Sequence, residues 1–306
     1  MADVDSIQLS AFVCADDPVA VVEESSALWA ALYPGRGFAT VLHAFDAVRS
    51  LYAGEYPGYH ACDTGYHDFK HTVAVFLAAV RLVDGCCASG AALPPLVAHD
   101  VLVAALFHDA GYIRRLGEEG YTGARFTAAH VGRSVQFIQE NARTLGLERP
   151  DDIARLVWST GLKDEFSRQA WASDEEHLAG ALLASADLIG QMGDRAYLEK
   201  LLFLYYEFRE AGIPGYNTEF DILRSTLSFY EMTIARLDGP LLGMRHYARA
   251  HCKLRYGVDR DLYEDAMERQ MDYLRGILDD DTSNFRKKLK RMDLEKMGSN
   301  AQNAIA

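Results

Sequence analysis

The stretch LPPLVAHDVLVAALFHDAGY, residues 93–112, begins near a proline pair and carries no polar side chain from Val101 to Phe107. A helix that is apolar on every side has to be buried, so this segment is predicted to form a central helix of an all-α fold. His108 and Asp109 follow the apolar run directly and therefore enter a medium of low dielectric. An unpaired buried carboxylate is costly, and a cation is its usual partner. We expect either a metal ion or a distant arginine beside Asp109.

Two further histidines, His67 and His71 in YHDFKH (residues 66–71), are four residues apart. On a helix this spacing places both imidazoles on one face, where they can address one cavity. Two exposed histidines on a surface helix would have the same spacing. The spacing alone therefore does not decide between a ligand pair and a surface pair.

Asp187 lies in LLASADLIGQM and is the only charged residue between His177 and Asp194. A position in the middle of a small and apolar run disfavours a capping role, because capping residues stand at helix ends. His130, in AAHVGRS, adds another imidazole. Imidazole and carboxylate groups together suit a divalent metal ion, so these stretches predict a metal site.

In this order the motifs resemble the HD-domain metal-dependent phosphohydrolases, and most closely the catalytic domain of cyclic-nucleotide phosphodiesterases. Tyr66–His71 is similar to the family's tyrosine-histidine-asparagine signature, and Ala105–Asp109 to its His-Asp helix. Ala186–Leu188 resembles the distal ligand segment, and Phe229 resembles the phenylalanine that clamps the base. The resemblance covers roughly residues 60–240 and implies a compact, multi-helix, phosphodiesterase-like domain.

The resemblance also implies a role for each of these residues. His71, His108, Asp109 and Asp187 would hold a first metal, and Asp109 would bridge to a second. A metal-activated hydroxide would attack phosphorus, and His67 would protonate the leaving oxygen, a step typically worth about 10² to 10⁴ in rate. The two divalent ions would be Mn, Mg, Zn, Fe or Ni. The residues expected near the second metal or the phosphate are His130 and Tyr112, and those expected to line the substrate pocket are Tyr66, Thr226 and Phe229.

Three positions depart from the family pattern. Tyr112 stands where phosphodiesterases have a histidine, and Asp68 stands where they have an asparagine. Thr226 aligns with the glutamine that reads the purine. A short hydroxyl cannot make a bidentate amide contact, so we expect little discrimination between adenine and guanine and poor hydrolysis of cyclic purine nucleotides.

The predicted function is therefore metal-dependent hydrolysis of a phosphate ester in a small phosphorylated substrate. Two alternatives remain open at this stage. The same ligands suit iron, as in HD-type di-iron oxygenases, and the chain could also be a metal-binding module without catalytic activity. The oligomeric state stays open as well, with a homo-oligomer among the options.

Composition narrows the class of partner and the compartment. The formal net charge of −13 disfavours nucleic acids and anionic membranes as partners. Five cysteines without paired metal-ligand spacing predict free thiols in a reducing compartment. The N-terminal residues lack a basic segment before an apolar core, and no uninterrupted apolar run reaches about 18 residues, so a cytoplasmic protein is expected.

Helical periodicity extends over nearly the whole chain. We expect an N-terminal helical segment over 1–58, the phosphohydrolase core over 59–240, and C-terminal helices with a tail over 241–306. His246 and His251 are expected at the surface, and the tail from Asn284 is expected to be a solvated helix. The predicted helices cover 39–51, 66–83, 96–107, 125–145, 151–160, 178–189, 196–211, 219–237 and 260–278.

Overall fold

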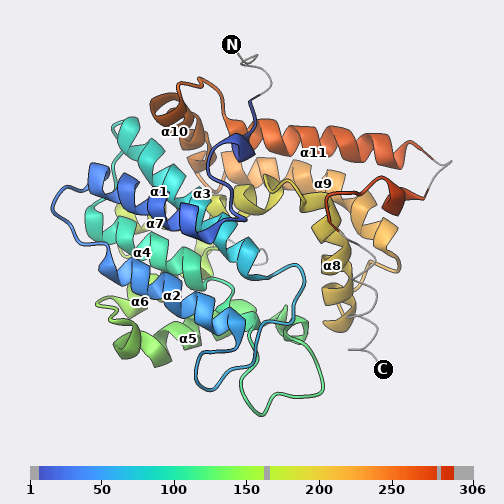
Figure 1. The fold of residues 1–306 in the computed structure, drawn as a ribbon, viewed down its shortest axis with the longest axis horizontal. Helices are drawn as coiled ribbons and strands as arrows, with labels where there is room; N and C mark the ends of the chain where they lie inside the picture. Colours follow the sequence, from blue (N-terminus) through green and yellow to red (C-terminus); the bar gives the residue numbers. More distant parts are fainter. Residues whose placement is uncertain (1–6, 162–165, 281–283, 293–306) are drawn as a thin grey trace.

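The computed structural model describes residues 7–161, 166–280 and 284–292 (Figure 1). Throughout these ranges the regular structure is helical, and the only β-type pairing in them is an isolated bridge between Tyr59 and Arg115. The prediction of a compact all-α fold is confirmed. The α-helices are α1 (Pro18–Leu32), α2 (Ala39–Ala53), α3 (Phe69–Ala88), α4 (Pro95–Phe107), α5 (His130–Leu145), α6 (Pro150–Trp158), α7 (Asp174–Met192), α8 (Tyr197–Glu210), α9 (Glu219–Asp238), α10 (Tyr247–Tyr256) and α11 (Leu262–Leu278).

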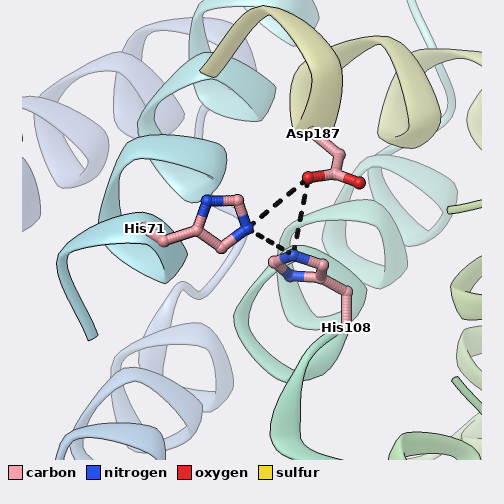
Figure 2. A group of neighbouring side chains, drawn as sticks. All are labelled: His71, His108 and Asp187. Atoms are coloured by element: carbon pink, nitrogen blue, oxygen red, sulfur yellow. Dashed lines mark hydrogen bonds and ion pairs between the residues drawn. The ribbon is translucent and has the colours of Figure 1, made fainter. Parts of the chain in front are cut away.

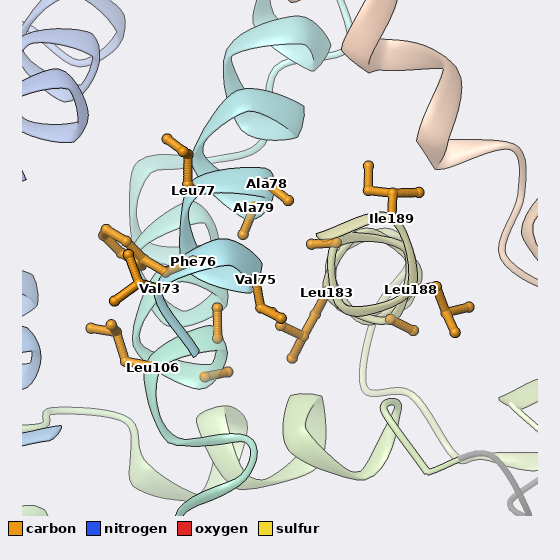
Figure 3. Packing of buried hydrophobic residues seen from close by; sticks show 14 of the residues in the cluster. Val73, Val75, Phe76, Leu77, Ala78, Ala79, Leu106, Leu183, Leu188 and Ile189 are labelled. Atoms are coloured by element: carbon orange, nitrogen blue, oxygen red, sulfur yellow. The ribbon is translucent and has the colours of Figure 1, made fainter. Parts of the chain in front are cut away.

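Helix α3 lies at the centre of the molecule and packs against α7, α10, α4 and α1. Figure 3 shows the interface with α7, where Val75 and Leu183 meet among buried aliphatic side chains. By length and composition α3 could cross a membrane, but 89% of its most apolar window is buried inside the molecule. Such burial is what a core helix of a globular domain shows.

One contiguous hydrophobic core extends along the chain from Val21 to Leu289. It includes residues from each of the three segments expected from the sequence. The N-terminal and C-terminal helices therefore share their core with the middle of the chain. The five cysteines are free, as expected.

Two expectations about helices were wrong. Helix α3 begins at Phe69 rather than at Tyr66, because the Asp68 side chain accepts a hydrogen bond from the backbone N–H of His71 and caps the helix. His67 thus precedes the helix, and the argument that His67 and His71 share a helical face does not hold. Helices α1 and α10 have no counterpart among the predicted helices, although both lie in segments that were expected to be helical.

His251 was expected at the surface, but the structure buries it completely. Its Nδ1 lies 2.7 Å from Oδ2 of Asp84, a carboxylate on α3 that also pairs with Arg255. His246 is exposed as expected, with 58% of its side chain accessible. The α10–α3 interface therefore contains a buried ionic cluster whose partners are distant in sequence.

The residues after α11 also differ from the expectation of a solvated helix. Leu289 is only 3% exposed, and the backbone N–H of Arg291 donates to Oε1 of Glu199 on α8 at 3.0 Å. Arg286 pairs with Glu219 at the start of α9. Residues 284–292 thus pack on the helical body, while the rest of the predicted tail, 293–306, lies outside the described residues.

Candidate metal centre

Three helices bring His71, His108 and Asp187 to one point (Figure 2). His71 lies in the first turn of α3, His108 directly follows α4, and Asp187 lies in α7. One ligand atom from each of the three lies within 4.8 Å of the others. The Nε2 atoms of the two histidines are 3.3 Å apart, and Oδ1 of Asp187 lies 3.6 Å from Nε2 of His71.

Asp109 completes the cluster. Its Oδ2 lies 3.2 Å from Nε2 of both His71 and His108, and its Oδ1 lies 3.6 Å from Nε2 of His130. The break in the helix after α4 positions it, since Asp109 has left helical geometry at φ −110° and ψ 10°. The structure therefore brings together the four residues predicted as ligands and places His130 beside them.

The buried Asp109 and the partly buried Asp187 have no lysine or arginine partner among the described residues. Within the described ranges, the ion-pair contacts of Asp109 and Asp187 are with histidines, and no lysine or arginine side chain lies within 4.0 Å of them. The alternative of a distant arginine beside Asp109 is thus not what the structure shows. The charge is balanced either by protonated imidazoles or by a cation, and a cation suits this set of donors.

Backbone contacts orient two of the histidines as ligands. Nδ1–H of His108 donates to the carbonyl of Ala105 at 2.8 Å, and Nδ1–H of His130 donates to the carbonyl of Thr127 at 2.7 Å. In the neutral imidazole, each contact leaves the lone pair on Nε2, the nitrogen that faces Asp109. Metal-bound histidines are held in this way in proteins.

The two histidines differ in protonation. Burial lowers the pKa of His130 below its ordinary value, so its imidazole is neutral at pH 7, the form that binds a metal. Burial alone would also lower the pKa of His108, but the nearby Asp109 carboxylate outweighs burial and raises that pKa to about 9. A cation bound here would therefore compete with a proton for His108.

A second group of polar contacts adjoins the cluster. Nδ1–H of His67 donates to Oε2 of Glu207 on α8 at 2.6 Å, and Oε1 of Glu207 accepts the backbone N–H of Tyr66 at 2.6 Å. Burial by itself lowers the pKa of His67, but the Glu207 carboxylate outweighs burial and holds it above its ordinary value. His67 is thus favoured as an imidazolium beside the candidate metal ligands.

Tyr112 packs against both His67 and His130. Its ring is stacked on that of His67 with centroids 4.1 Å apart, and on that of His130 with centroids 4.6 Å apart. Burial raises the pKa of the Tyr112 hydroxyl well above its ordinary value, so the phenol stays neutral. Tyr112 therefore fixes the positions of two imidazoles.

Tyr66, Thr226 and Phe229 were predicted to line a substrate pocket. No contact among the described residues brings the three together. Tyr66 is near the cluster, but its hydroxyl donates to Oε1 of Gln191 at 2.5 Å. Thr226 is buried in α9, and its hydroxyl donates to the carbonyl of Ile222 at 2.7 Å. Phe229 packs against the hydrophobic core, and α9 packs mainly on α8 and the turn before α10. A base clamp built from Thr226 and Phe229 has no support in these contacts.

Glu207 is the residue of this site that the sequence analysis missed. It lies in LLFLYYEFREAG, residues 201–212, flanked by aromatic side chains. A lone carboxylate within a long apolar run was the signal that identified Asp187, but Glu207 is followed closely by Arg209 and Glu210, so that signal is much weaker there. The structure shows that Glu207 is 5% exposed, which places it among the buried charges.

One family model, described as Npun_R2479-like, matches residues 115–242 of the chain. The matched region begins after His71, His108 and Asp109, and it includes His130, Asp187 and Glu207. No curated protein matches the chain.

Proposed function

We propose that the protein is a metal-dependent phosphohydrolase that cleaves a phosphate ester of a small molecule. The observation that carries the proposal is the meeting of Asp109 and the partly buried Asp187 with the buried His71 and His108, with no lysine or arginine among the described residues to compensate the carboxylates. His67, an imidazolium paired with the Glu207 carboxylate, lies beside these ligands and adds a proton donor.

The donor set fits a divalent cation. His71, His108, Asp109 and Asp187 would hold it, and the neutral imidazole of His130 lies beside Asp109 to support a second ion. Bound there, such an ion lowers the pKa of water toward about 7 and neutralises charge on the phosphoryl oxygens. The resemblance of the motifs to the HD-domain phosphohydrolases supports this assignment.

The residues of the chain supply proton transfer and positioning. His67 keeps a proton at neutral pH because Glu207 raises its pKa, and it can deliver that proton from Nε2 to the departing alkoxide. Tyr112 restricts the tilt of the His67 ring by stacking on it. Glu207 also accepts the backbone N–H of Tyr66, which fixes the position of the segment that carries His67.

The first test is metal content, measured by inductively coupled plasma mass spectrometry on protein as purified. Wild type should contain at least one divalent metal per chain, and Asp109→Ala and Asp187→Ala should each lose most of it. The control is Asp46→Ala, which removes an exposed carboxylate paired with Arg49 on α2. Metal content that is unchanged in both site variants, with native circular dichroism, would exclude the centre.

The second test is hydrolysis of a nitrophenyl phosphodiester and of an alkyl phosphodiester by protein reconstituted with manganese. His67→Ala should keep its metal and lose more rate on the alkyl ester, because the poorer leaving group needs the proton more. Equal losses on both esters would assign His67 to positioning. Absence of hydrolysis, together with iron and an absorption band in air-exposed protein, would favour the di-iron oxygenase instead.

A further inference from the structure

A second cavity adjoins α3 and α7, about one helical turn beyond the candidate metal ligands on those helices. Its volume is about 310 Å³, at the lower end of the range of small-molecule sites. Helices α3, α7 and α11 line it together with residues 8–16 and Arg291, so both ends of the described chain contribute to its wall. None of the candidate metal ligands lines this cavity.

The cavity is rich in basic side chains although the chain as a whole is strongly acidic. The basic residues in its wall are Lys70, Arg81, Arg195, Arg269 and Arg291. Two acidic residues, Asp16 and Asp194, also line it, but each is already paired with a lysine. Asp16 lies 3.0 Å from Lys70, and Asp194 lies 2.6 Å from Lys200.

Three of these guanidinium groups have no carboxylate partner among the described residues. Arg195 and Arg269 form no side-chain ion pair in the described chain, and the Arg291 guanidinium contacts neutral groups, namely the Arg195 carbonyl, the Gln270 side-chain oxygen and the Tyr273 ring. These neutral contacts hold Arg291 against Arg195, and Gln270 fixes the same backbone by donating to the carbonyl of Arg195 at 3.0 Å. The three guanidinium groups line one cavity and carry the same charge, and a bound anion reduces the repulsion between them.

Arg81 adds a buried donor to the same wall. It is 1% exposed, its Nη atoms donate to the Tyr263 hydroxyl and the Val13 carbonyl, and Nη2 lies 3.5 Å from Oε2 of Glu24. Its Nε has no hydrogen-bond partner in the part of the chain that the structure describes. A buried N–H without a partner is rare and indicates a missing acceptor.

From these observations we infer that the cavity is a binding site for a small polyanion with two or more negative charges, carried by phosphate or carboxylate groups. Guanidinium groups bind both kinds of anion through paired hydrogen bonds, whereas a neutral ligand would leave the three charges unbalanced. The inference does not depend on the proposed hydrolytic activity. The site shares its helices with the metal centre, because Ala74 and Gly190 line it one turn after His71 and Asp187.

The test is isothermal titration of the full-length protein with inorganic pyrophosphate at low ionic strength. Wild type should bind it, and Arg195→Gln/Arg269→Gln should weaken binding at least tenfold. Both arginines are exposed at the rim, so the double variant should keep its fold, which circular dichroism checks. Arg49→Gln/Arg143→Gln changes the net charge equally on α2 and α5 and should bind as wild type does.

Asp187→Asn separates this site from the metal centre. Unchanged pyrophosphate binding in Asp187→Asn, with loss in the Arg195/Arg269 double variant, supports the assignment. The opposite pattern, loss in Asp187→Asn and retention in the double variant, would place pyrophosphate at the metal centre and overturn the inference. Equal weakening in both double variants would reduce the effect to general electrostatics, and absence of binding to wild type would also refute it.

Discussion

Nδ1 of His67 and Oε2 of Glu207 lie 2.6 Å apart, although 140 residues separate them in the chain. His67 stands in the segment before α3, and Glu207 is in the last turn of α8. The contact determines the charge of His67, since a nearby carboxylate stabilises the imidazolium and burial opposes it. The protonation state of the candidate acid therefore depends on a helix outside the metal cluster.

The first prediction concerns Glu207→Gln. The pKa of His67 is raised by Glu207, so a reaction that needs the imidazolium should lose rate as pH rises through that pKa. Without the carboxylate the pKa falls, and the alkaline limb of the kcat profile should move to lower pH. Titration of the His67 ring by NMR should show the same shift without relying on activity.

The control for this variant lies one turn further along α8. Glu210 accepts hydrogen bonds from the backbone N–H and hydroxyl of Thr122, each at 2.6 Å, and has no contact with His67. Glu210→Gln should leave the pH profile and the NMR titration where they are in wild type. An alkaline limb that stays in place in Glu207→Gln would remove His67 as the proton donor.

The two carboxylates of the candidate metal centre were predictable because their signal is local. Asp109 and Asp187 stand next to or within apolar runs. A charged residue in such a run can be recognised as a buried, functional candidate without knowledge of the fold. Glu207 lacked this signal, because Arg209 and Glu210 follow it and make the end of α8 look like an ordinary charged helix end. The start of α3 was also readable, since Asp68 stands three residues before the backbone N–H that it caps.

Other features could not be read from the sequence, because distant segments create them. His251 looks like a surface residue until α10 packs on α3 and brings it against Asp84. The basic cavity needs Arg195, Arg269 and Arg291 to meet, and nothing in the order of residues brings them together. Local patterns predict which side chains must be buried, whereas tertiary packing decides which of them meet.

The second prediction concerns the turn that follows Asp109. A Cβ on Gly111 would lie 1.9 Å from the carbonyl oxygen of His130, which no real Cβ tolerates. The backbone N–H of Gly111 donates to Ser134 at 2.8 Å, and its carbonyl accepts from Nε of Arg133 at 2.8 Å. Gly111→Ala should therefore push α5 away, cost about 2 to 3 kcal/mol of unfolding free energy and displace His130 from Asp109.

Gly132→Ala is the matched control, two residues beyond His130 in α5. Its added Cβ would meet only Trp158, at an ordinary contact distance of 3.5 Å. Alanine is the better helix former by up to about 1 kcal/mol, so this variant should be neutral or slightly more stable. Urea unfolding and metal content measure both effects, and a Gly111→Ala protein as stable as Gly132→Ala would contradict the described packing.

The last prediction concerns pH and the N-terminus of α11. The Asp261 side chain accepts the backbone N–H groups of Tyr263 and Glu264 at 2.9 Å and 3.1 Å, yet burial raises the pKa of this carboxyl to about 6. Between about pH 4 and pH 6 the folded protein therefore binds more protons at Asp261 than the unfolded chain does. Stability falls as pH rises through this range, and the loss is complete above the raised pKa. Asp261→Asn keeps an acceptor for both N–H groups but does not titrate.

The stability of Asp261→Asn relative to wild type should consequently increase from pH 4 to pH 7, by about 2 kcal/mol. Urea unfolding at a series of pH values measures this difference. Asp17→Asn is the control, because Asp17 caps α1 by accepting the backbone N–H groups of Val19 and Ala20 but is exposed. It makes the same chemical change at a cap without burial. A constant difference across pH for Asp261→Asn would show that burial does not dominate the environment of this carboxyl. A decrease toward pH 7 would mean that the charge of Asp261 stabilises α11 more than its burial costs.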